Sequence, residues 1–331
     1  MLTSLHLQNF KGFKDTTIPE LRKVNLILGG QNVGKTSLLE AVIFVAGDVI
    51  NSNAPGARSR LPEIFRPCET EGDQIRFWKG IVGTEKNPIA VWVKANINSK
   101  TYAMGGYKQC DEAAEKMRFL LDENTPVDWF AKPTGVFNSK DLPHDAEIPH
   151  PFSVEPKKAV EQVELYGRLV TGKKKKDVLK LLQKIEPRID SIDAVAPDGE
   201  HRVYIDLTDG HVLPLSQLGH GFTRLFELYA GLAITESKLA LIDEIENGIH
   251  YSALPRLFQG VRELAELNEV QSLITTHSWE CIRAAYKTFA DAGRLQDFQL
   301  IRLEHDDDNI RAVLINDEIL ETVMEADYEI R

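Results

Sequence analysis

VNLILGGQNVGKTSLLEAVIFVA, residues 24–46, is the stretch of this sequence that decides the fold. Residues 24–28 form an apolar run, which is typical of a strand buried on both faces of a sheet. After the loop, Leu38 and Val42 recur at helical spacing, so the sequence predicts a helix there. The loop between them, GGQNVGKT at 29–36, matches the pattern G-x-x-x-x-G-K-[ST] in the strand, loop and helix order that the pattern requires.

A loop of this kind is suited to hold a polyphosphate. Its glycines let the backbone approach the anion closely, and the amides at the start of the following helix point toward it. We expect Lys35 to contact the β- and γ-phosphates of a nucleotide and the Thr36 hydroxyl to ligate Mg²⁺. The alternative is a glycine-rich turn that merely caps a helix, which the flanking elements disfavour. The expected nucleotide-binding residues are Gly29, Gly30, Gln31, Asn32, Val33, Gly34, Lys35, Thr36 and Ser37.

The composition limits the class of protein. With 331 residues, 43% of them hydrophobic, the chain can bury a full core and should form one large domain or two smaller ones. Acidic residues outnumber basic ones, 50 to 39, and the net charge of −11 repels nucleic acid and anionic membranes at long range. Three cysteines are too few for a disulfide framework, and no apolar run is long enough to span a bilayer. We therefore expect a cytoplasmic protein without a membrane partner.

The C-terminal part of the sequence alternates helix and strand patterns. Buried-strand patterns at 239–243 and 272–276 follow helical patterns at 221–237 and 254–267, which predicts βαβ units and a parallel sheet. A hairpin at 298–316 would add antiparallel strands. The expected fold class is therefore α/β with a mixed β-sheet.

The middle of the sequence is less regular. Two β-rich runs at 75–82 and 89–97 predict a hairpin, and an amphipathic segment follows at 110–121. Helical spacing returns at 177–185, and two Asp-Gly pairs then separate alternating apolar runs, which is a strong hairpin signal. The two pairs are Asp198-Gly199 and Asp209-Gly210.

Two acidic residues follow the buried strand at 239–243. In KLALIDEIE, residues 238–246, Asp243 stands where the strand leaves a parallel sheet, so it can hold Mg²⁺ through water. Glu244 is the expected general base that orients the attacking water. The alternative is an acid that caps a helix after a strand, which becomes less plausible when the same chain carries the glycine loop.

A histidine follows the next buried strand. SLITTHS, residues 272–278, places His277 at the strand exit, where it can detect a γ-phosphate by a hydrogen bond. A single histidine is more often structural. The order of glycine loop, acid pair and histidine favours the nucleotide role, so we expect His277 to act in catalysis with Lys35 and Glu244.

Five stretches give the chain a family resemblance. The chain resembles the ATP-binding-cassette (ABC) class of P-loop ATPases, and within it the head domains of the SMC, RecF and OLD (overcoming-lysogenization-defect) group. It looks most similar to the stand-alone AAA-type ATPases of prokaryotic defence systems. The stretches are FKGFKD (10–15), GGQNVGKTSLLEAV (29–42), LGHGFTRLFELYAGLA (218–233), LIDEIENGIH (241–250) and TTHS (275–278).

The resemblance implies a homodimer that closes around ATP. In this group two heads hold two ATP molecules between them, and the P-loop of one chain faces the signature loop of the other. Here the signature loop would be residues 218–222, in which Gly219, His220 and Gly221 would offer backbone amides to the partner's γ-phosphate. Gly219 stands where the family has a serine, so either Ser216 replaces that contact or the contact is absent.

The resemblance also assigns residues outside these loops. Asn247 and Gly248 fall in the family's D-loop, which contacts the partner subunit. Gln74 is a candidate for the glutamine that contacts Mg²⁺. Lys11 and Lys14 match positions near the nucleotide, and a solvated turn is an equal alternative for them.

The expected architecture is an ABC-type head formed by residues 1–50 and 201–331, with a lobe of β-hairpins and helices inserted at 51–200. It would bind and slowly hydrolyse ATP as the sensor or motor subunit of an anti-phage defence or DNA-maintenance complex. OLD nucleases carry a TOPRIM nuclease domain, and too few residues follow His277 for one. A nuclease or toxin effector, for example a TOPRIM-like one, is therefore expected as a separate chain.

Two other functions stay open. The altered signature loop suits a non-hydrolysing module, in which nucleotide only gates binding of a partner effector. A RecF-like DNA-repair ATPase on duplex DNA would need a basic patch, and residues 173–176 are the only dense basic run of the sequence. At a net charge of −11, a solvated loop is the favoured interpretation of that run.

Overall fold

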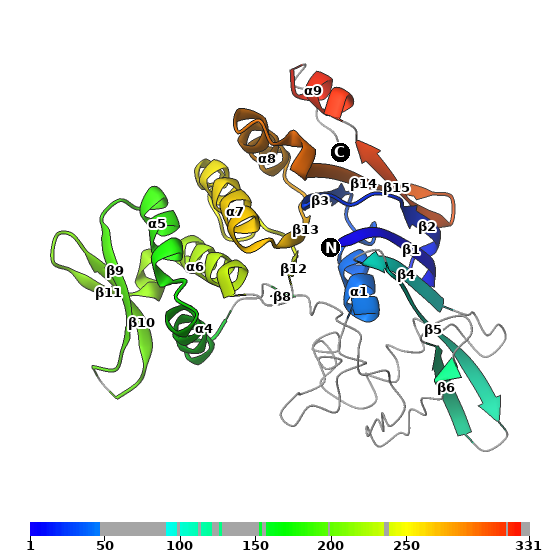
Figure 1. Ribbon diagram of the computed structural model, residues 1–331, viewed down its shortest axis with the longest axis horizontal. Helices are drawn as coiled ribbons and strands as arrows, with labels where there is room; N and C mark the ends of the chain where they lie inside the picture. The colour runs from blue at the N-terminus through cyan, green and yellow to red at the C-terminus, as the bar shows by residue number, and fades with distance from the viewer. Residues whose placement is uncertain are drawn as a thin grey trace. The chain divides into compact units, whose positions relative to one another are not determined.

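The chain folds into two compact units. The computed structural model describes residues 1–46, 91–97, 100–111, 114–120, 126–127, 152–153, 157–197, 199–234, 238–315 and 317–325. Unit 1 contains Met1–Leu21, Gly29–Pro151 and Ile301–Leu314, and unit 2 contains Arg22–Leu28, Phe152–Leu300 and Ile315–Arg331. The chain passes from one unit to the other within β3 (Val24–Gly29), β14 (Phe298–Asp306) and β15 (Asn309–Ile315), which are labelled in Figure 1, and also after Leu21 and Pro151.

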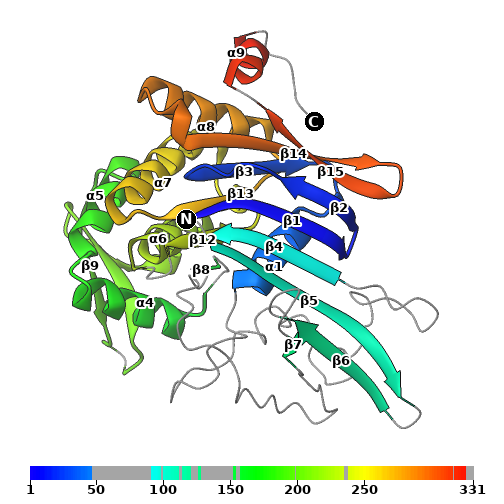
Figure 2. The same cartoon turned by 45° about the vertical axis from the view of Figure 1, so that its right-hand side comes forward.

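Unit 1 is built on an antiparallel sheet with the strand order β2-β1-β4-β5-β6-β7. Leu5 and Leu7 of β1 are buried, so the alternation in the N-terminal sequence puts one face of this strand in the core. Helix α1 packs against β1, β4 and β5 (Figure 2). The elements are β1 (Leu2–Phe10), β2 (Phe13–Ile18), α1 (Lys35–Ala46), β4 (Val91–Ile97), β5 (Lys100–Asp111), β6 (Ala114–Leu120) and β7 (Pro126–Val127).

The described residues of the amphipathic segment at 110–121, to which the sequence assigns no element, form strand. They belong to β5 and β6, which pair antiparallel with Cys110 opposite Glu115. Over so short a run, the apolar residues of the segment fit both the helical period of about 3.6 residues and the strand period of 2. Pairing with a neighbouring strand decides between helix and strand. Of the expected hairpin, the arm at 89–97 overlaps β4, which pairs with β1 and β5, whereas the arm at 75–82 lies outside the described residues.

Unit 2 is built on a parallel sheet in which β3, β13 (Gln271–Thr275), β12 (Leu239–Ile242) and β8 (Phe152–Ser153) are neighbours in that order. Every residue of β12 and β13 is buried, as expected for strands that are covered on both faces. The register pairs Ile27 with Thr275 and Ile242 with Ile274. The carboxyl ends of β3, β13 and β12 therefore lie side by side at one edge of the sheet.

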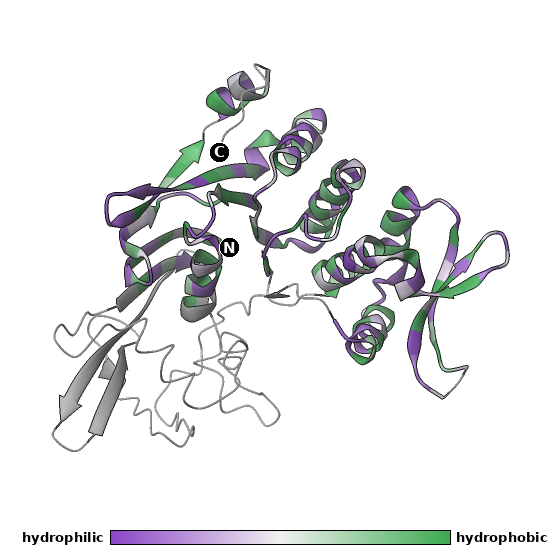
Figure 3. Cartoon of the chain, turned by 180° about the vertical axis from the view of Figure 1, so that it is seen from behind, coloured by the Kyte–Doolittle hydropathy of each residue, from purple (hydrophilic) through white to green (hydrophobic). Residues whose placement is uncertain are grey.

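Three helices of unit 2 are α6 (His220–Ile234), α7 (Leu254–Asn268) and α8 (Trp279–Asp291). Helix α7 packs against both α6 and α8, and Figure 3 shows its hydrophobic residues gathered along one side. The approach of α6 and α7 depends on Gly260, because a Cβ atom there would lie 2.4 Å from the ring of Tyr229. The Tyr229 hydroxyl donates to the Arg256 carbonyl oxygen at 3.0 Å, which fixes the same contact.

A small antiparallel sheet of unit 2 has the strand order β11-β10-β9. Gly199 and Gly210, the glycines of the two Asp-Gly pairs, both take a φ of 87°, which is the left-handed conformation that tight hairpin turns require. Helices α4 and α5 cover β10 and β9 and also pack on α6. The elements are α4 (Ala159–Thr171), α5 (Lys175–Ile185), β9 (Ile189–Val195), β10 (Arg202–Leu207), β11 (Val212–Pro214) and the 3-10 helix η1 (Leu215–Leu218).

The remaining elements are η2 (Tyr251–Ala253), η3 (Leu295–Asp297), β15 (Asn309–Ile315), which neighbours β14, and α9 (Asp317–Glu325). The expected inserted lobe, residues 51–200, is divided between the two units. Its helices α4 and α5 belong to unit 2, where they pack on α6. The division into head and inserted lobe stays a prediction. None of the described helices is both long and apolar enough to cross a membrane.

Candidate functional site

The glycine loop at 29–36, in unit 1 from Gly29 onward, needs glycine at both fixed positions of its pattern. A Cβ atom on Gly29 would lie 2.5 Å from Val33 Cγ1 and 2.8 Å from the Leu303 carbonyl oxygen. Gly34 has a φ of 87°, and a Cβ atom there would lie 2.9 Å from Ile310 Cδ1. These separations are well below a normal carbon contact. A larger residue at either position would therefore deform the loop.

Lys35 lies along the inside of this loop. It is the first residue of α1 and only 6% exposed. Its Nζ donates to the carbonyl oxygens of Gly29 at 2.9 Å and Gly30 at 2.8 Å. The ammonium group is thus held against the loop backbone, at the place where the sequence pattern expects a phosphate.

The N-terminus of α1 presents partial positive charge. The first turn of the helix contains no acidic residue, so no carboxylate of that turn offsets the helix dipole. Amides of a first turn have no acceptor within their own helix, and the Leu38 amide, which donates to the Gly34 carbonyl at 2.9 Å, begins the regular pattern. Thr36 is exposed in this first turn.

Lys11 and Lys14 both make ion pairs within unit 1. Lys11 pairs with Glu40 of α1, and Lys14 pairs with Asp308. The Lys14 pair is exposed to solvent, and the Lys11 pair is partly buried. Their expected place near the nucleotide stays a prediction.

In unit 2, the end of β13 holds the acid pair that follows β12. The Thr275 hydroxyl donates to Asp243 Oδ1, and Thr275 Oγ1 accepts the Glu244 backbone N–H at 2.8 Å. The Ile245 backbone N–H donates to the Thr275 carbonyl oxygen at 3.2 Å. Thr275 is completely buried. The sequence analysis did not assign Thr275 a role, and a hydroxyl residue at the strand end was its only signal.

Glu244 and His277 meet at the same edge. His277 Nε2 lies 3.5 Å from Glu244 Oε1, and the two side chains are 40% and 51% exposed. Glu244 has a φ of 46°, a conformation that costs roughly 1–3 kcal/mol for a residue other than glycine and is often found at functional sites. The structure therefore brings Asp243, Glu244 and His277 together, while the glycine loop starts directly after Leu28 of the neighbouring strand β3.

The signature loop at 218–222 opens helix α6. After η1, Gly219 adopts a φ of 90°, and α6 begins at His220. The Thr223 backbone N–H and hydroxyl both donate to the Gly219 carbonyl, at 3.1 and 3.2 Å. Ser216 is exposed in η1, and its carbonyl accepts the Gly219 N–H at 3.4 Å. Gly219 is thus suited to the turn that a serine in its place would strain.

Gly221 has a different reason to be glycine. A Cβ atom on Gly221 would lie 2.7 Å from the Gly248 carbonyl oxygen. The start of α6 therefore packs directly against the D-loop of the same chain. Any side chain at 221 would push the two apart.

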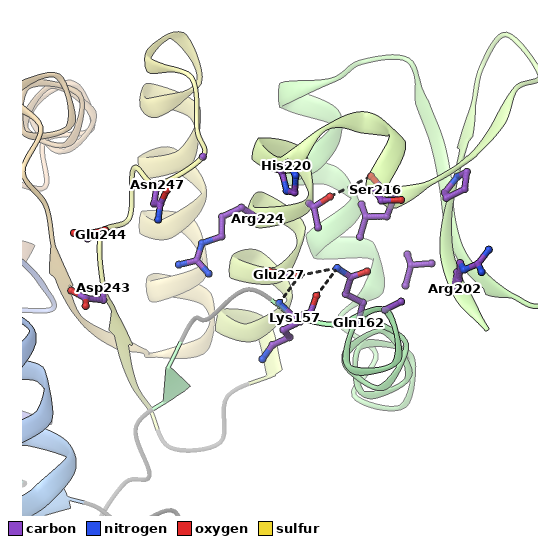
Figure 4. Close-up of a pocket in the computed structure, with 16 residues that line it drawn as sticks. Lys157, Gln162, Arg202, Ser216, His220, Arg224, Glu227, Asp243, Glu244 and Asn247 are labelled. Atoms are coloured by element: carbon purple, nitrogen blue, oxygen red, sulfur yellow. Dashed lines mark hydrogen bonds between the residues drawn. The ribbon is translucent and has the colours of Figure 1, made fainter. Parts of the chain in front are cut away.

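A cavity of about 700 Å³ in unit 2 extends from the acid pair to α4 and β10 (Figure 4). Arg224 projects from α6 toward Asp243 and Glu244 in this view, a position that the sequence analysis did not identify. The polar side chains of the lining are Lys157, Gln162, Arg202, Ser216, His220, Thr223, Arg224, Glu227, Asp243, Glu244 and Asn247.

Glu227 forms part of this lining although only 2% of it is exposed. Its Oε1 accepts the Gln162 side-chain N–H at 2.9 Å and the Lys157 backbone N–H at 3.2 Å. Burial raises the pKa of the Glu227 carboxyl group above its ordinary value. Glu227 therefore joins the signature helix α6 to the start of α4.

The basic run at 173–176 is attached to neighbouring elements. Lys174 Nζ donates to Asn268 Oδ1 at 2.7 Å, and Lys175 Nζ donates to Asp193 Oδ1 at 2.7 Å. Two lysines of the run thus link the start of α5 to α7 and β9. This favours a structural role over phosphate binding.

A divalent metal would need oxygen ligands from separate parts of the chain. Within the described ranges, no group of three or more His, Cys, Asp or Glu side chains could hold a metal alone. Thr36 and Asp243 supply the hard oxygen atoms that Mg²⁺ prefers, so their chemistry fits it. Gln74, the third expected ligand, lies outside the described residues.

Two protein families match adjacent parts of the chain. The family described as an AAA ATPase domain matches residues 1–121. An AAA-domain family that bears the name of the AbiEii toxin of a type IV TA system matches residues 131–282. A Helicobacter pylori protein named ATP/GTP phosphatase is 22% identical over 355 residues, which cover 93% of this chain and 93% of that protein.

Solved structures of SMC heads share the fold. The SMC head domain from Thermotoga maritima covers 95% of this chain and 99% of its own, with a TM-score of 0.52 and 14% identity. An Smc head bound to the C-terminal winged-helix domain of ScpA covers 97% and 99%, at a TM-score of 0.56 and 14% identity. A Pyrococcus furiosus Smc head with an extended coiled coil, bound to the C-terminal domain of ScpA, covers 99% of both chains at a TM-score of 0.56 and 12% identity.

Proposed function

We propose that this chain, of which two parts match AAA-domain families and whose fold is shared with SMC heads, is an ABC-type P-loop ATPase that binds ATP, hydrolyses it slowly and forms a homodimer around it. One observation carries the proposal. The glycine loop, the acid pair and His277 follow β3, β12 and β13, and the carboxyl ends of these parallel strands are adjacent. In open α/β sheets, ligands bind at such strand ends.

The glycine loop would bind the phosphates of ATP. Lys35 would exchange its two carbonyl acceptors for phosphate oxygens, and the amides at the start of α1 would donate to the same group. Mg²⁺ bound by Thr36 and Asp243 would supply charge neutralisation at the phosphates. The Thr275 hydroxyl keeps the Asp243 carboxylate in one orientation.

Glu244 would accept a proton from the attacking water. Its carboxylate is half exposed and 3.5 Å from His277 Nε2, so it can reach both a water molecule and the imidazole. His277 would donate to the γ-phosphate. In phosphoryl transfer, catalysis comes mostly from positioning and charge stabilisation. The buried Thr275, which bonds both Asp243 and the Glu244 backbone, is suited to that positioning.

The signature loop would complete the site of a second copy. Helix α6 starts at His220, directly after Gly219 with its positive φ. The backbone amides at a helix N-terminus bind anions, so those of His220 and Gly221 would bind the γ-phosphate of the second copy's ATP. The two ScpA-bound Smc heads are each in contact with a domain of a different protein. By analogy, we propose a separate effector chain, a nuclease or a toxin, in an anti-phage defence or DNA-maintenance complex.

Hydrolysis separates this proposal from the nucleotide-gated binding module. Glu244→Gln should lower phosphate release by about 10²-fold or more and should accumulate an ATP-bound dimer in light-scattering measurements. Lys35→Ala should lose both ATP binding and the dimer. Glu263→Gln is the matched control, because Glu263 is a half-exposed acid of α7 that bonds Lys184 instead.

Each outcome has a separate meaning. A wild-type rate in Glu244→Gln would show that another group is the base. Dimerisation with ATP but no phosphate release from the wild-type protein would favour the non-hydrolysing module.

A further inference from the structure

Glu246 is an acid of the loop that follows β12. It lies two residues after Glu244, and its Oε1 accepts the backbone N–H of His277 at 2.7 Å. The Glu244 carboxylate contacts the imidazole of the same histidine. Two acids of one loop therefore contact one histidine, the first through its ring and the second through its backbone.

The bond from Glu246 fixes a part of the chain that backbone pairing does not reach. Thr276 is held by β3, through its N–H to the Ile27 carbonyl at 3.0 Å, and the Ser278 N–H donates to the Thr276 hydroxyl at 3.0 Å. Between them, the His277 N–H donates to the Glu246 carboxylate. Hydrogen bonds to an ionised acceptor are roughly twice as strong as neutral ones, so Glu246 sets the backbone position of His277.

The charge of Glu246 also suits its surroundings. The bond places the carboxylate beside the start of α8, where Ser278 is the N-cap and a negative charge is favoured by the helix dipole. Its charge helps to raise the pKa of the buried Cys281 thiol, after the larger effect of burial. Glu246 Oε2 is buried and has no hydrogen-bond partner among the described residues.

We propose that Glu246 is a positioning residue that sets His277 against Glu244 and thereby the rate of ATP hydrolysis. The inference rests on the proposed ATPase function. A misplacement of about 1 Å at a reacting group can reduce a rate by about 10²-fold. Removal of the Glu246 carboxylate should therefore lower turnover while ATP binding, which depends on the glycine loop, is retained.

A double-mutant cycle with His277 tests this inference. Glu246→Ala should lower kcat by about 10- to 10²-fold with KM for ATP within about twofold of wild type. Because Glu246 acts through His277, Glu246→Ala should have almost no further effect on kcat in a His277→Ala background. Glu246→Gln, which keeps the acceptor oxygen, should restore most of the loss. The melting temperature of each variant is measured alongside, with Glu263→Ala as the control that removes a glutamate of α7, which pairs with Lys184.

Additive effects of Glu246→Ala and His277→Ala would overturn the inference, as would wild-type kcat in Glu246→Ala. Both results leave the proposed ATPase function intact if Glu244→Gln still abolishes phosphate release. If the wild-type protein releases no phosphate, the proposed hydrolysis itself fails. Should Glu246→Ala not fold, the cycle is run with Glu246→Asp, whose shorter side chain should lower kcat in the wild-type background and have almost no effect in the His277→Ala background. An equal loss in both backgrounds would overturn the inference.

Discussion

Glu227 is the only buried acid among the described residues, and its protonation links pH to stability. Because burial raises its pKa in the folded chain, the folded state binds the proton more tightly than the unfolded state does. Its contribution to the free energy of unfolding is then largest below the unfolded pKa of about 4.3. That contribution falls as pH rises through the folded pKa.

Glu227→Gln should therefore stabilise the protein at neutral pH. Glutamine keeps an acceptor for Gln162 and Lys157 but removes the buried charge. We expect the melting temperature at pH 7.5 to rise by about 2–4 °C, roughly 1 kcal/mol, with a smaller gain at pH 5. Thermal melts at both pH values measure this, with the exposed Glu200→Gln as control. The same pH dependence in wild type and Glu227→Gln would contradict the prediction.

At the scale of elements, α6 connects most of the groups discussed above. Its first turn carries the signature loop and touches the D-loop at Gly248, its middle carries Arg224 and Glu227, and its far side packs on α7. A displacement of α6 would therefore change the signature loop and the cavity together. The close contact of α6 with α7 at Gly260 leaves little room for such a displacement.

Gly221→Ala tests the contact between α6 and the D-loop. The added Cβ atom would lie 2.7 Å from the Gly248 carbonyl oxygen, and overpacking of this kind costs about 1–3 kcal/mol. We expect a lower melting temperature and reduced ATP-dependent dimerisation. Gly167→Ala in α4 is the matched control, because it has open space within 4 Å and should raise helix stability by up to about 1 kcal/mol. An unchanged dimer yield in Gly221→Ala would show that dimer formation does not depend on the contact between Gly221 and the D-loop.

At the scale of the whole molecule, charge argues against direct DNA binding. The net charge is −11, and two lysines of the basic run are engaged with Asn268 and Asp193. The negative electrostatic field of such a chain repels the phosphates of DNA. Positive charge on a partner chain would be needed to offset it. The defence or maintenance role would then depend on a second chain for contact with nucleic acid.

Filter binding to duplex DNA tests this at two salt concentrations. We expect binding by the isolated chain to stay weak at about 50 mM salt, with or without ATP. A contact of the four lysines at 173–176 with four phosphates would weaken by about 10²-fold between 50 and 200 mM salt. Tight binding with that salt dependence would instead support the RecF-like alternative.

Much of the core could be predicted because its signals are local. The strand before the glycine loop, the strands at 239–243 and 272–276 and the helix at 254–267 appear within one or two residues of their expected bounds. Each is a run of apolar residues whose period or continuity is visible in the sequence. The strands at 110–121 could not be predicted, because the apolar residues there fit both the helical and the strand period. Helix α4 (Ala159–Thr171) was not predicted either, because we identified no helical signal there.

The sequence by itself determined the identities and order of the groups that would act on a nucleotide: the glycine loop with Lys35, the acid pair and His277. These depend on short patterns whose chemistry is fixed by residue type and spacing. The tertiary structure alone decided which residues hold them. Thr275 binds Asp243 from another strand, Glu246 binds the His277 backbone from 31 residues away, and Gly221 touches Gly248. Such contacts join residues that are distant in sequence, and only the parallel register of the sheet and the packing of α6 bring them together.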